Sequence, residues 1–211
     1  MSRPFLSRLY LVISQEACLG RDIVEVAEQA VKGGVDLIQL REKHLYTDDF
    51  IATAIRLREM LATHAVPLII NDNLQVAIES KAFGIHVGNT DIPPSVIKRD
   101  WTECGLLGYS VEYVEQLSNN EIHYADYLGV SPVFSTPTKT DTVTEWGLEG
   151  IRNIRSLTDK PLVAIGNMSM TNAYDVIKAG ADCLAVVSAI CGADNPAQAA
   201  WAIRNEIEKA L

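Results

Sequence analysis

Two aspartates follow consecutive apolar runs near the middle of the chain, each where a strand is expected to end. Asp72 comes after the run at 66–70 and its neighbour Asn71, and Asp91 comes after the run at 84–87. Apolar residues at helical spacing separate the runs, which predicts strand, helix, strand. A right-handed crossover makes the two strands parallel and brings their ends to the same sheet edge. Two carboxylates beside an amide, with no cysteine or adjacent histidine, suit Mg²⁺ rather than Zn²⁺.

An aspartate after a strand can instead cap the next helix, and either Asp72 or Asn73 has a side chain suited to that role. Two such acids, at the ends of consecutive parallel strands, leave capping and metal binding equally open.

A second polar group follows the predicted strand at 35–40. Gln39, Arg41 and Lys43 occupy alternate positions, so they share one face if the strand continues. Long polar side chains at a strand end suit an anion pocket, in which arginine grips phosphate oxygens in a bidentate manner. The alternative role is an ion-pair network with Glu42 or with the two aspartates.

Other predicted strands also end in polar residues. Ser110 follows the strand at 105–109, and a long polar loop at 131–146 follows the strand at 125–130. A hydroxyl-rich loop with one lysine is typical of a lid that closes over phosphate, although a solvated loop has the same composition. The lid residues that would reach a substrate are Thr136, Thr138 and Lys139.

The last two predicted strands end in Gly166-Asn167 and Val187-Ser188. Barrel enzymes commonly hold a phosphate there, on backbone N–H groups and a short helix. His86 lies within a strand and is expected to be a hydrogen-bonded barrel residue rather than a metal ligand. The chain has no G-x-S-x-G nucleophile elbow.

Eight apolar runs alternate with segments at helical spacing along the chain. The expected strands are 9–13, 35–40, 66–70, 84–87, 105–109, 125–130, 161–165 and 183–187. The expected helices are 21–32, 47–64, 73–81, a weak one from about 93, 111–117, 148–157, 171–179 and 196–210. This order predicts a single (β/α)₈ TIM-barrel domain over residues 1–211. A doubly wound open sheet would need a glycine fingerprint after the first strand, where the chain has Ser14-Gln15-Glu16.

The amino-acid composition limits the classes of molecule that the protein is expected to bind. The 211 residues are 48% hydrophobic and 21% charged, with a net charge of −9. That balance argues against nucleic acid and against an anionic membrane surface. The four cysteines show no zinc or C-x-x-C spacing, and no run is long enough for a signal peptide or membrane span. We therefore expect free thiols and a cytoplasmic protein, and the sequence leaves open a homo-oligomer.

Several segments, taken together and in order, resemble the thiamine-phosphate synthase (thiamine-phosphate pyrophosphorylase) family. They are Q-L-R-E-K, I-N-D, G-I-H-V-G-x-x-D, L-G-Y-S, A-D-Y-L-G-V-S-P-V-F-x-T-x-T-K-x-D, W-G-L-E-G and A-G-A-D-C-L-A-V-V-S-A-I. The resemblance covers nearly the whole chain. It implies a (β/α)₈ transferase of thiamine biosynthesis that joins hydroxymethylpyrimidine diphosphate to thiazole phosphate with Mg²⁺ and releases diphosphate.

The resemblance also implies roles for particular residues. Asp72 and Asp91 would bind Mg²⁺. The pyrimidine diphosphate would be held by Gln39, Arg41, Lys43, Asn71 and Ser110. Thr136, Thr138 and Lys139 would reach the substrates from the lid, and Gly166, Val187 and Ser188 would take the thiazole phosphate. The groups acting in catalysis would be Arg41, Lys43, Ser110 and Lys139.

One position departs from the family, which usually has a second glycine where this chain has Asn167. Asparagine tolerates the left-handed region that glycine favours, so we expect the same backbone path there. Three other functions share much of this pattern. A general phosphate-metabolite barrel, such as an epimerase or aldolase, would place a catalytic acid, base or Schiff-base lysine at a strand end, and Lys43 is the only lysine close to such a place. A thiazole tautomerase of the same superfamily would lack the paired aspartates and the diphosphate cations, and a non-catalytic thiamine-phosphate binding barrel would have no use for the metal site.

Overall fold

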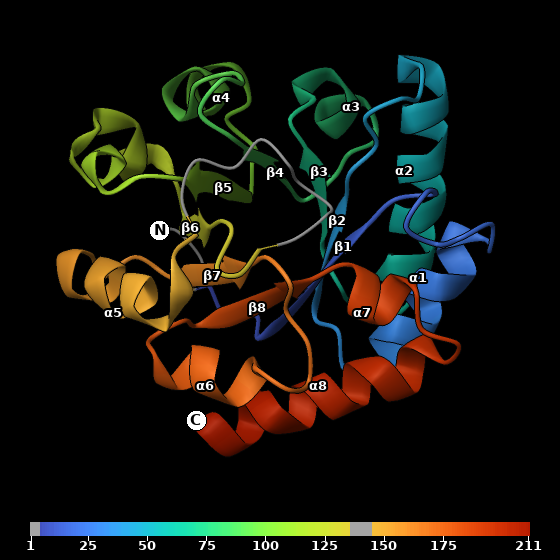
Figure 1. The fold of residues 1–211 in the computed structure, drawn as a ribbon. Helices are drawn as coiled ribbons and strands as arrows, with labels where there is room; N and C mark the ends of the chain where they lie inside the picture. Colours follow the sequence, from blue (N-terminus) through green and yellow to red (C-terminus); the bar gives the residue numbers. More distant parts are fainter. Residues whose placement is uncertain (1–4, 136–144) are drawn as a thin grey trace.

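Eight parallel strands close into a barrel in the computed structural model, which describes residues 5–135 and 145–211 (Figure 1). Each strand pairs with its neighbours in sequence order, and β1 pairs with β8 to complete the circle. The strands are β1 (Leu9–Ile13), β2 (Leu37–Leu40), β3 (Leu68–Asn71), β4 (Gly84–Val87), β5 (Leu106–Val111), β6 (Tyr127–Val130), β7 (Leu162–Ile165) and β8 (Cys183–Val186). The predicted (β/α)₈ barrel is confirmed.

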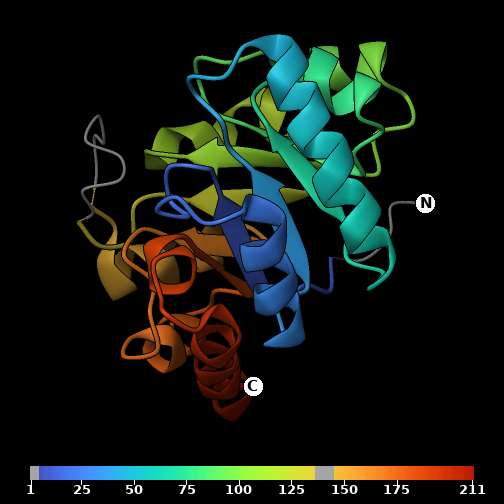
Figure 2. The same ribbon diagram turned by 90° about the vertical axis from the view of Figure 1, so that its right-hand side faces the viewer.

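Helices surround the barrel and cover the outer faces of its strands (Figure 2). They are α1 (Ile23–Lys32), α2 (Thr47–Ala62), α3 (Leu74–Glu79), α4 (Pro94–Asp100), α5 (Gly147–Leu157), α6 (Ala173–Lys178), α7 (Ser188–Cys191) and α8 (Pro196–Ala210). Two 3₁₀ turns, Val114–Ser118 and Asn120–Tyr124, lie between β5 and β6. The described part of the chain contains no helix with the length and apolar character needed to cross a membrane.

The predicted elements are present, but two places differ from the sequence pattern. The helix predicted at 111–117 is wrong in its bounds and type, because β5 continues through Val111 and short 3₁₀ turns follow it. Asn119 ends the first turn and its side chain caps the second, which divides the segment. The four-residue helix α7 was not predicted, since one turn is too short to show a 3.6-residue period.

Apolar side chains form two layers, one inside the barrel and one between the strands and the helices. The inner layer includes Leu37, Ile69 and Leu106, all nearly inaccessible to solvent. Alternation along each strand sends neighbouring side chains to opposite layers. Two tyrosines, Tyr10 and Tyr127, belong to the inner layer and place their hydroxyl groups in the barrel interior.

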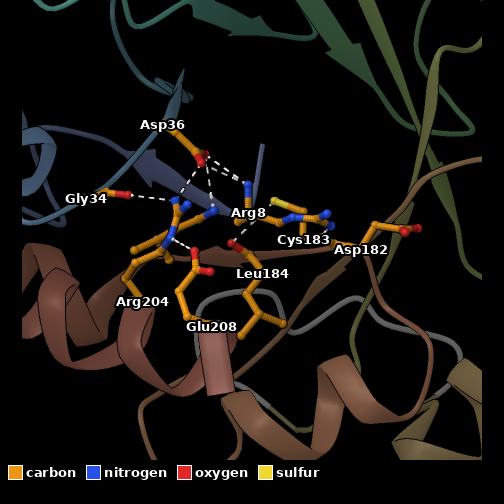
Figure 3. A network of polar contacts seen from close by, with 9 residues as sticks. Arg8, Gly34, Asp36, Asp182, Cys183, Leu184, Arg204 and Glu208 are labelled. Carbon is orange, nitrogen blue, oxygen red and sulfur yellow. Dashed lines mark hydrogen bonds and ion pairs between the residues drawn. The ribbon is translucent and has the colours of Figure 1, made fainter. Parts of the chain in front are cut away.

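The amino-terminal edge of the barrel is held by an aspartate just before β2 (Figure 3). The Asp36 carboxylate accepts hydrogen bonds from the backbone N–H groups of Arg8 and Leu9, at 3.0–3.2 Å. Arg204 of α8 donates to the same carboxylate at 2.7 Å and to the Gly34 carbonyl at 3.2 Å. This carboxylate therefore ties β1, β2 and the last helix together.

The same arrangement recurs at two other even-numbered strands. Asp126, before β6, accepts from the backbone N–H of β5 at 2.8 Å and pairs with Lys98 at 2.9 Å. Asp182, before β8, accepts from the backbone N–H of β7 at 2.8 Å and pairs with Arg155 at 3.0 Å. Each carboxylate satisfies a backbone donor at the start of the preceding strand, on the edge opposite the strand ends that carry the site.

We expect Asp36→Ala to lower the free energy of unfolding by about 2–3 kcal/mol, because it leaves backbone donors and Arg204 without their acceptor. Urea denaturation measures this change. Asp159→Ala, at an exposed acid on the surface, serves as the control and should stay within about 0.5 kcal/mol of the parent. Equal stability of the two variants would contradict the role of Asp36.

Candidate active site

A cavity of about 720 Å³ opens at the carboxyl ends of the strands. It brings together eleven of the residues predicted from sequence, which come from the ends of six strands. They are Gln39, Arg41, Lys43, Asn71, Asp72, Asp91, Ser110, Gly166, Asn167, Val187 and Ser188. The other three predicted residues, Thr136, Thr138 and Lys139, lie outside the residues that the structure describes.

The two aspartates lie in contact at one side of this cavity. Asn73 caps α3 by accepting a backbone hydrogen bond at 3.0 Å, so the Asp72 carboxylate is not the cap. Asp72 has a positive φ of 61°, and its backbone N–H donates to the His86 carbonyl at 2.9 Å. Asp91 accepts from the Gly88 N–H at 2.8 Å. The end of β3 and the loop after β4 thus hold the two carboxylates side by side.

Proximity changes the acidity of this pair. Burial, followed by hydrogen bonding and charge repulsion from Asp91, raises the pKa of Asp72 to about 7. Asn71, which donates to the Asp72 carboxylate, and the charge of Lys43 act in the opposite direction. Two half-buried acids whose ionised forms repel each other are stabilised by a cation between them.

The donor set fits Mg²⁺. Oxygen ligands from two carboxylates and an amide match its preference, and Mg²⁺ usually completes its shell with water and substrate phosphate rather than more protein. Among the described residues no group of three or more acids, histidines or cysteines could enclose a metal by itself. The arrangement is therefore typical of an ion that arrives with a phosphorylated substrate.

The raised pKa of Asp72 predicts a pH dependence of stability for the metal-free protein. Between 3.8, the ordinary pKa, and about 7, the folded chain keeps a proton that the unfolded chain releases. The contribution of Asp72 to the free energy of unfolding therefore falls as the pH rises through this window. Asp72→Asn should remove that fall, and urea titrations in chelator across the window measure it. An identical pH dependence in parent and variant would contradict the prediction.

Two cations face the cavity without a counterion. Arg41 is half-buried and Lys43 is exposed, and neither forms an ion pair with any residue in the described ranges. The alternative ion pair with Glu42 is wrong, because that carboxylate instead accepts from the Gln15 N–H at 2.7 Å. Burial raises the pKa of Glu42. Unpaired positive charge in a chain with a net charge of −9 marks a local anion site.

The opposite side of the cavity carries the glycine–asparagine turn. Gly166 and Asn167 have φ values of 113° and 54°, so asparagine does adopt the left-handed backbone expected of it. A side chain at Gly166 would come within 2.7 Å of Pro132. The Asn172 amide donates to the Asn167 carbonyl at 2.9 Å and fixes the turn. Ser188 begins α7 after the adjacent strand β8, so the turn and the start of α7 line the cavity at neighbouring strand ends.

The structure adds a cavity residue that the sequence assigned to the barrel interior. His86 is hydrogen-bonded as predicted, through Nδ1 to Tyr127 at 3.0 Å and through Nε2 to Ser110 at 2.9 Å. Tyr10 and Tyr127, which also line the cavity, were missed. Gly108, inside a predicted strand, is a signal that could have found Tyr127, since strand glycines often mark a close approach; no comparable signal points to Tyr10.

A second missed group supports the loop that carries Asp91. Gln116 is buried and donates to the Ser110 carbonyl at 3.0 Å and also to the side chain of Asn89. Asn89 in turn donates to Glu112 at 2.9 Å. This amide network joins the ends of β4 and β5. It was invisible in the sequence because Gln116 lies in a turn that carries no motif.

The fold and the cavity define the class: a (β/α)₈-barrel enzyme with its active site at the carboxyl ends of the strands. The sequence profile described as thiamine monophosphate synthase matches residues 9–190. The chain therefore belongs to the thiamine monophosphate synthase family.

Individual proteins agree with this assignment. A thiamine-phosphate synthase of Albidiferax ferrireducens is 48% identical over 95% of this chain and 92% of its own length. One from Leptospira biflexa is 44% identical over 94% and 96%. Among solved structures, a thiamine phosphate pyrophosphorylase of Pyrococcus furiosus superposes with a TM-score of 0.88 and 32% identity, covering 97% of this chain and 96% of that one.

Proposed function

We propose that this chain transfers the hydroxymethylpyrimidine group from its diphosphate to the nitrogen of thiazole phosphate, and that the transfer requires Mg²⁺. The observation that carries the proposal is one cavity in which a pair of touching carboxylates lies with two cations that form no ion pair within residues 5–135 and 145–211. A diphosphate that carries Mg²⁺ matches both halves of that arrangement. The relatives named above, which are transferases of thiamine biosynthesis, support the same reaction.

The pyrimidine diphosphate belongs at the side of the cavity formed by β2 to β5. Asp72 and Asp91 would hold Mg²⁺, which would supply Lewis-acid stabilisation of the diphosphate. Arg41 and Lys43 bind the same oxygens and stabilise the negative charge that grows as diphosphate departs. The uncharged groups that orient this substrate are Gln39, Asn71 and Ser110.

The thiazole phosphate belongs at the other side. The donors we assign to its phosphate are the backbone N–H groups of Gly166 and Asn167, which form a left-handed turn after β7, and those of Val187 and Ser188 at the start of α7, after the adjacent strand β8. The phosphate is held by these backbone donors and by the Ser188 hydroxyl. Thr136, Thr138 and Lys139 lie outside the described residues, and their contact with the substrates stays an expectation from the family resemblance.

The proposed reaction requires the protein mainly to supply positive charge and to position the two substrates. Departure of diphosphate leaves a pyrimidine-methyl cation, which the thiazole nitrogen then attacks. This order needs no enzyme nucleophile and no strong base. It does need water to be excluded, since water would capture the cation.

A diphosphate-release assay tests the proposal directly. With both substrates and Mg²⁺, the chain should release diphosphate and form thiamine phosphate in equal amounts, and a chelator should stop both. Consumption of a thiazole without any pyrimidine substrate would indicate the tautomerase instead. Binding of thiamine phosphate with no turnover of the paired substrates would indicate a binding barrel.

A further inference from the structure

A chain of hydrogen bonds crosses the barrel interior and joins the two ends of the pyrimidine side of the cavity. Gln39 Nε2 donates to Tyr10 Oη at 2.8 Å, and Tyr10 Oη lies 3.0 Å from Tyr127 Oη. Tyr127 Oη lies 3.0 Å from His86 Nδ1, and His86 Nε2 lies 2.9 Å from Ser110 Oγ. The five side chains come from five different strands, so the tertiary fold alone assembles them.

The barrel is built to accommodate this chain. A methyl group at Gly108 would collide with His86 Nδ1 and with the ring and hydroxyl of Tyr127. One at Gly129 would lie 2.9 Å from His86 Cε1. The ring of Tyr127 also stacks on His86, with centroids 5.5 Å apart. Two glycines thus leave the space in which the central hydrogen bond forms.

The bonding capacity of each group sets the direction of the chain. Tyr10 accepts from the Gln39 amide, so its single proton is free to point at Tyr127. If Tyr127 donated to Tyr10 instead, the Tyr10 proton would have no acceptor among the described residues. That arrangement is costly because Tyr10 is only 1% exposed. Tyr127 then donates to His86 Nδ1, so the neutral imidazole carries its proton on Nε2 and donates to Ser110. The Ser110 proton points onward into the cavity.

We propose that Tyr10, Tyr127 and His86 are positioning residues that fix opposite polarity at the two ends of this chain. Gln39 uses one of its two amide N–H groups on Tyr10, which orients the amide so that its carbonyl oxygen is presented to the substrate. Ser110, which accepts from His86, presents its proton. The ligand that fits is a ring that shows a donor to Gln39 and an acceptor to Ser110.

The aminopyrimidine ring of the proposed substrate has this character, since its amino group donates and its ring nitrogens accept. Replacing the amino group by a carbonyl inverts the pattern, because the oxygen accepts and the neighbouring ring nitrogen gains a proton. The protein should therefore bind the oxo form of the pyrimidine less tightly than the amino form. This identification of the ligand rests on the proposed function, whereas the direction of the chain does not.

The first measurement is the tautomer of His86. In a ¹⁵N NMR spectrum at about pH 8, where an ordinary imidazole is neutral, the protein should show His86 protonated on Nε2. The signal is assigned by its loss in His86→Asn. Tyr127→Phe removes the donor to Nδ1 and should produce a mixture of tautomers. A parent protein protonated on Nδ1 would overturn the proposed direction.

The second measurement is binding of the aminopyrimidine diphosphate and of its oxo analogue, by calorimetry with Mg²⁺ and without thiazole phosphate. The parent should prefer the amino form by about tenfold or more. Tyr127 forms no hydrogen bond with Gln39 or Ser110 in the described structure, yet Tyr127→Phe should bring the ratio of dissociation constants close to one. Ile69→Val, which removes a methyl group from the same interior layer, should leave the ratio unchanged.

The outcomes separate this proposal from the one it builds on. A wild-type ratio retained in Tyr127→Phe, or lost equally in Ile69→Val, would overturn the positioning role even if turnover is normal. Failure of the parent to bind either pyrimidine would overturn the proposed function, while the tautomer of His86 would still decide the direction of the chain.

Discussion

Asp72→Asn and Asp91→Asn are each expected to lower turnover by about a thousandfold or more. Each change halves the carboxylate charge available to Mg²⁺ beside the departing diphosphate. An amide oxygen is still a ligand, so a large excess of Mg²⁺ should recover part of the loss. Initial rates of diphosphate release across a Mg²⁺ titration measure both effects.

Asp175→Asn, at an exposed acid on α6, controls for the removal of one negative charge and should keep the parent rate. Thermal stability of the two site variants should not fall, because Asp72 and Asp91 repel each other in the metal-free protein. Parent-level turnover in either variant, or in excess chelator, would rule out the metal site.

The second large effect is expected at Arg41, which has no counterion among the described residues and faces the same cavity. Arg41→Ala should lower kcat/KM for the pyrimidine diphosphate by about 10²–10³-fold, because a cation that meets the leaving group is lost. Arg41→Lys should restore only part of the rate, since lysine cannot form the bidentate contact. The KM for thiazole phosphate should change by less than about threefold, a shift well below 1.4 kcal/mol.

Steady-state kinetics with each substrate varied in turn provide the test. Arg56→Ala, on the surface of α2 where it pairs with Asp22, is the matched control and should leave both parameters at parent values. If Arg41→Ala instead weakened thiazole phosphate binding alone, Arg41 would belong to the other half of the cavity.

The order of apolar runs was sufficient to predict the barrel, because each run needs burial on both faces and the intervening helices satisfy one of them. It also located the cavity residues. Once the strands are parallel, polar side chains that follow them gather at one edge of the barrel. Asp72, Asp91 and Arg41 were therefore predicted as cavity residues from their positions after a strand. The left-handed backbone at Asn167 followed from the glycine that the family usually has there and from the tolerance of asparagine for that region.

The choice between two roles for one residue could not be made from the sequence. Asp72 and Asn73 can both cap a helix, and only the folded backbone shows that Asn73 does so. Glu42 could have neutralised Arg41, but the loop after β1 brings the Gln15 N–H to it instead. These are competitions between neighbours in space, and sequence spacing carries no information about which neighbour is nearer.

The sequence by itself determined the fold, the family and the edge of the barrel where the polar residues gather, since all three follow from local periodicity and motif order. Only the tertiary structure decided which side chains of different strands form hydrogen bonds with one another. Tyr10, Gln39, His86, Ser110 and Tyr127 are separated by as many as 117 residues, and their hydrogen bonds exist because closure of the barrel turns five strands toward one axis. Inside that barrel each donor must find an acceptor, and the geometry of closure decides which one it finds.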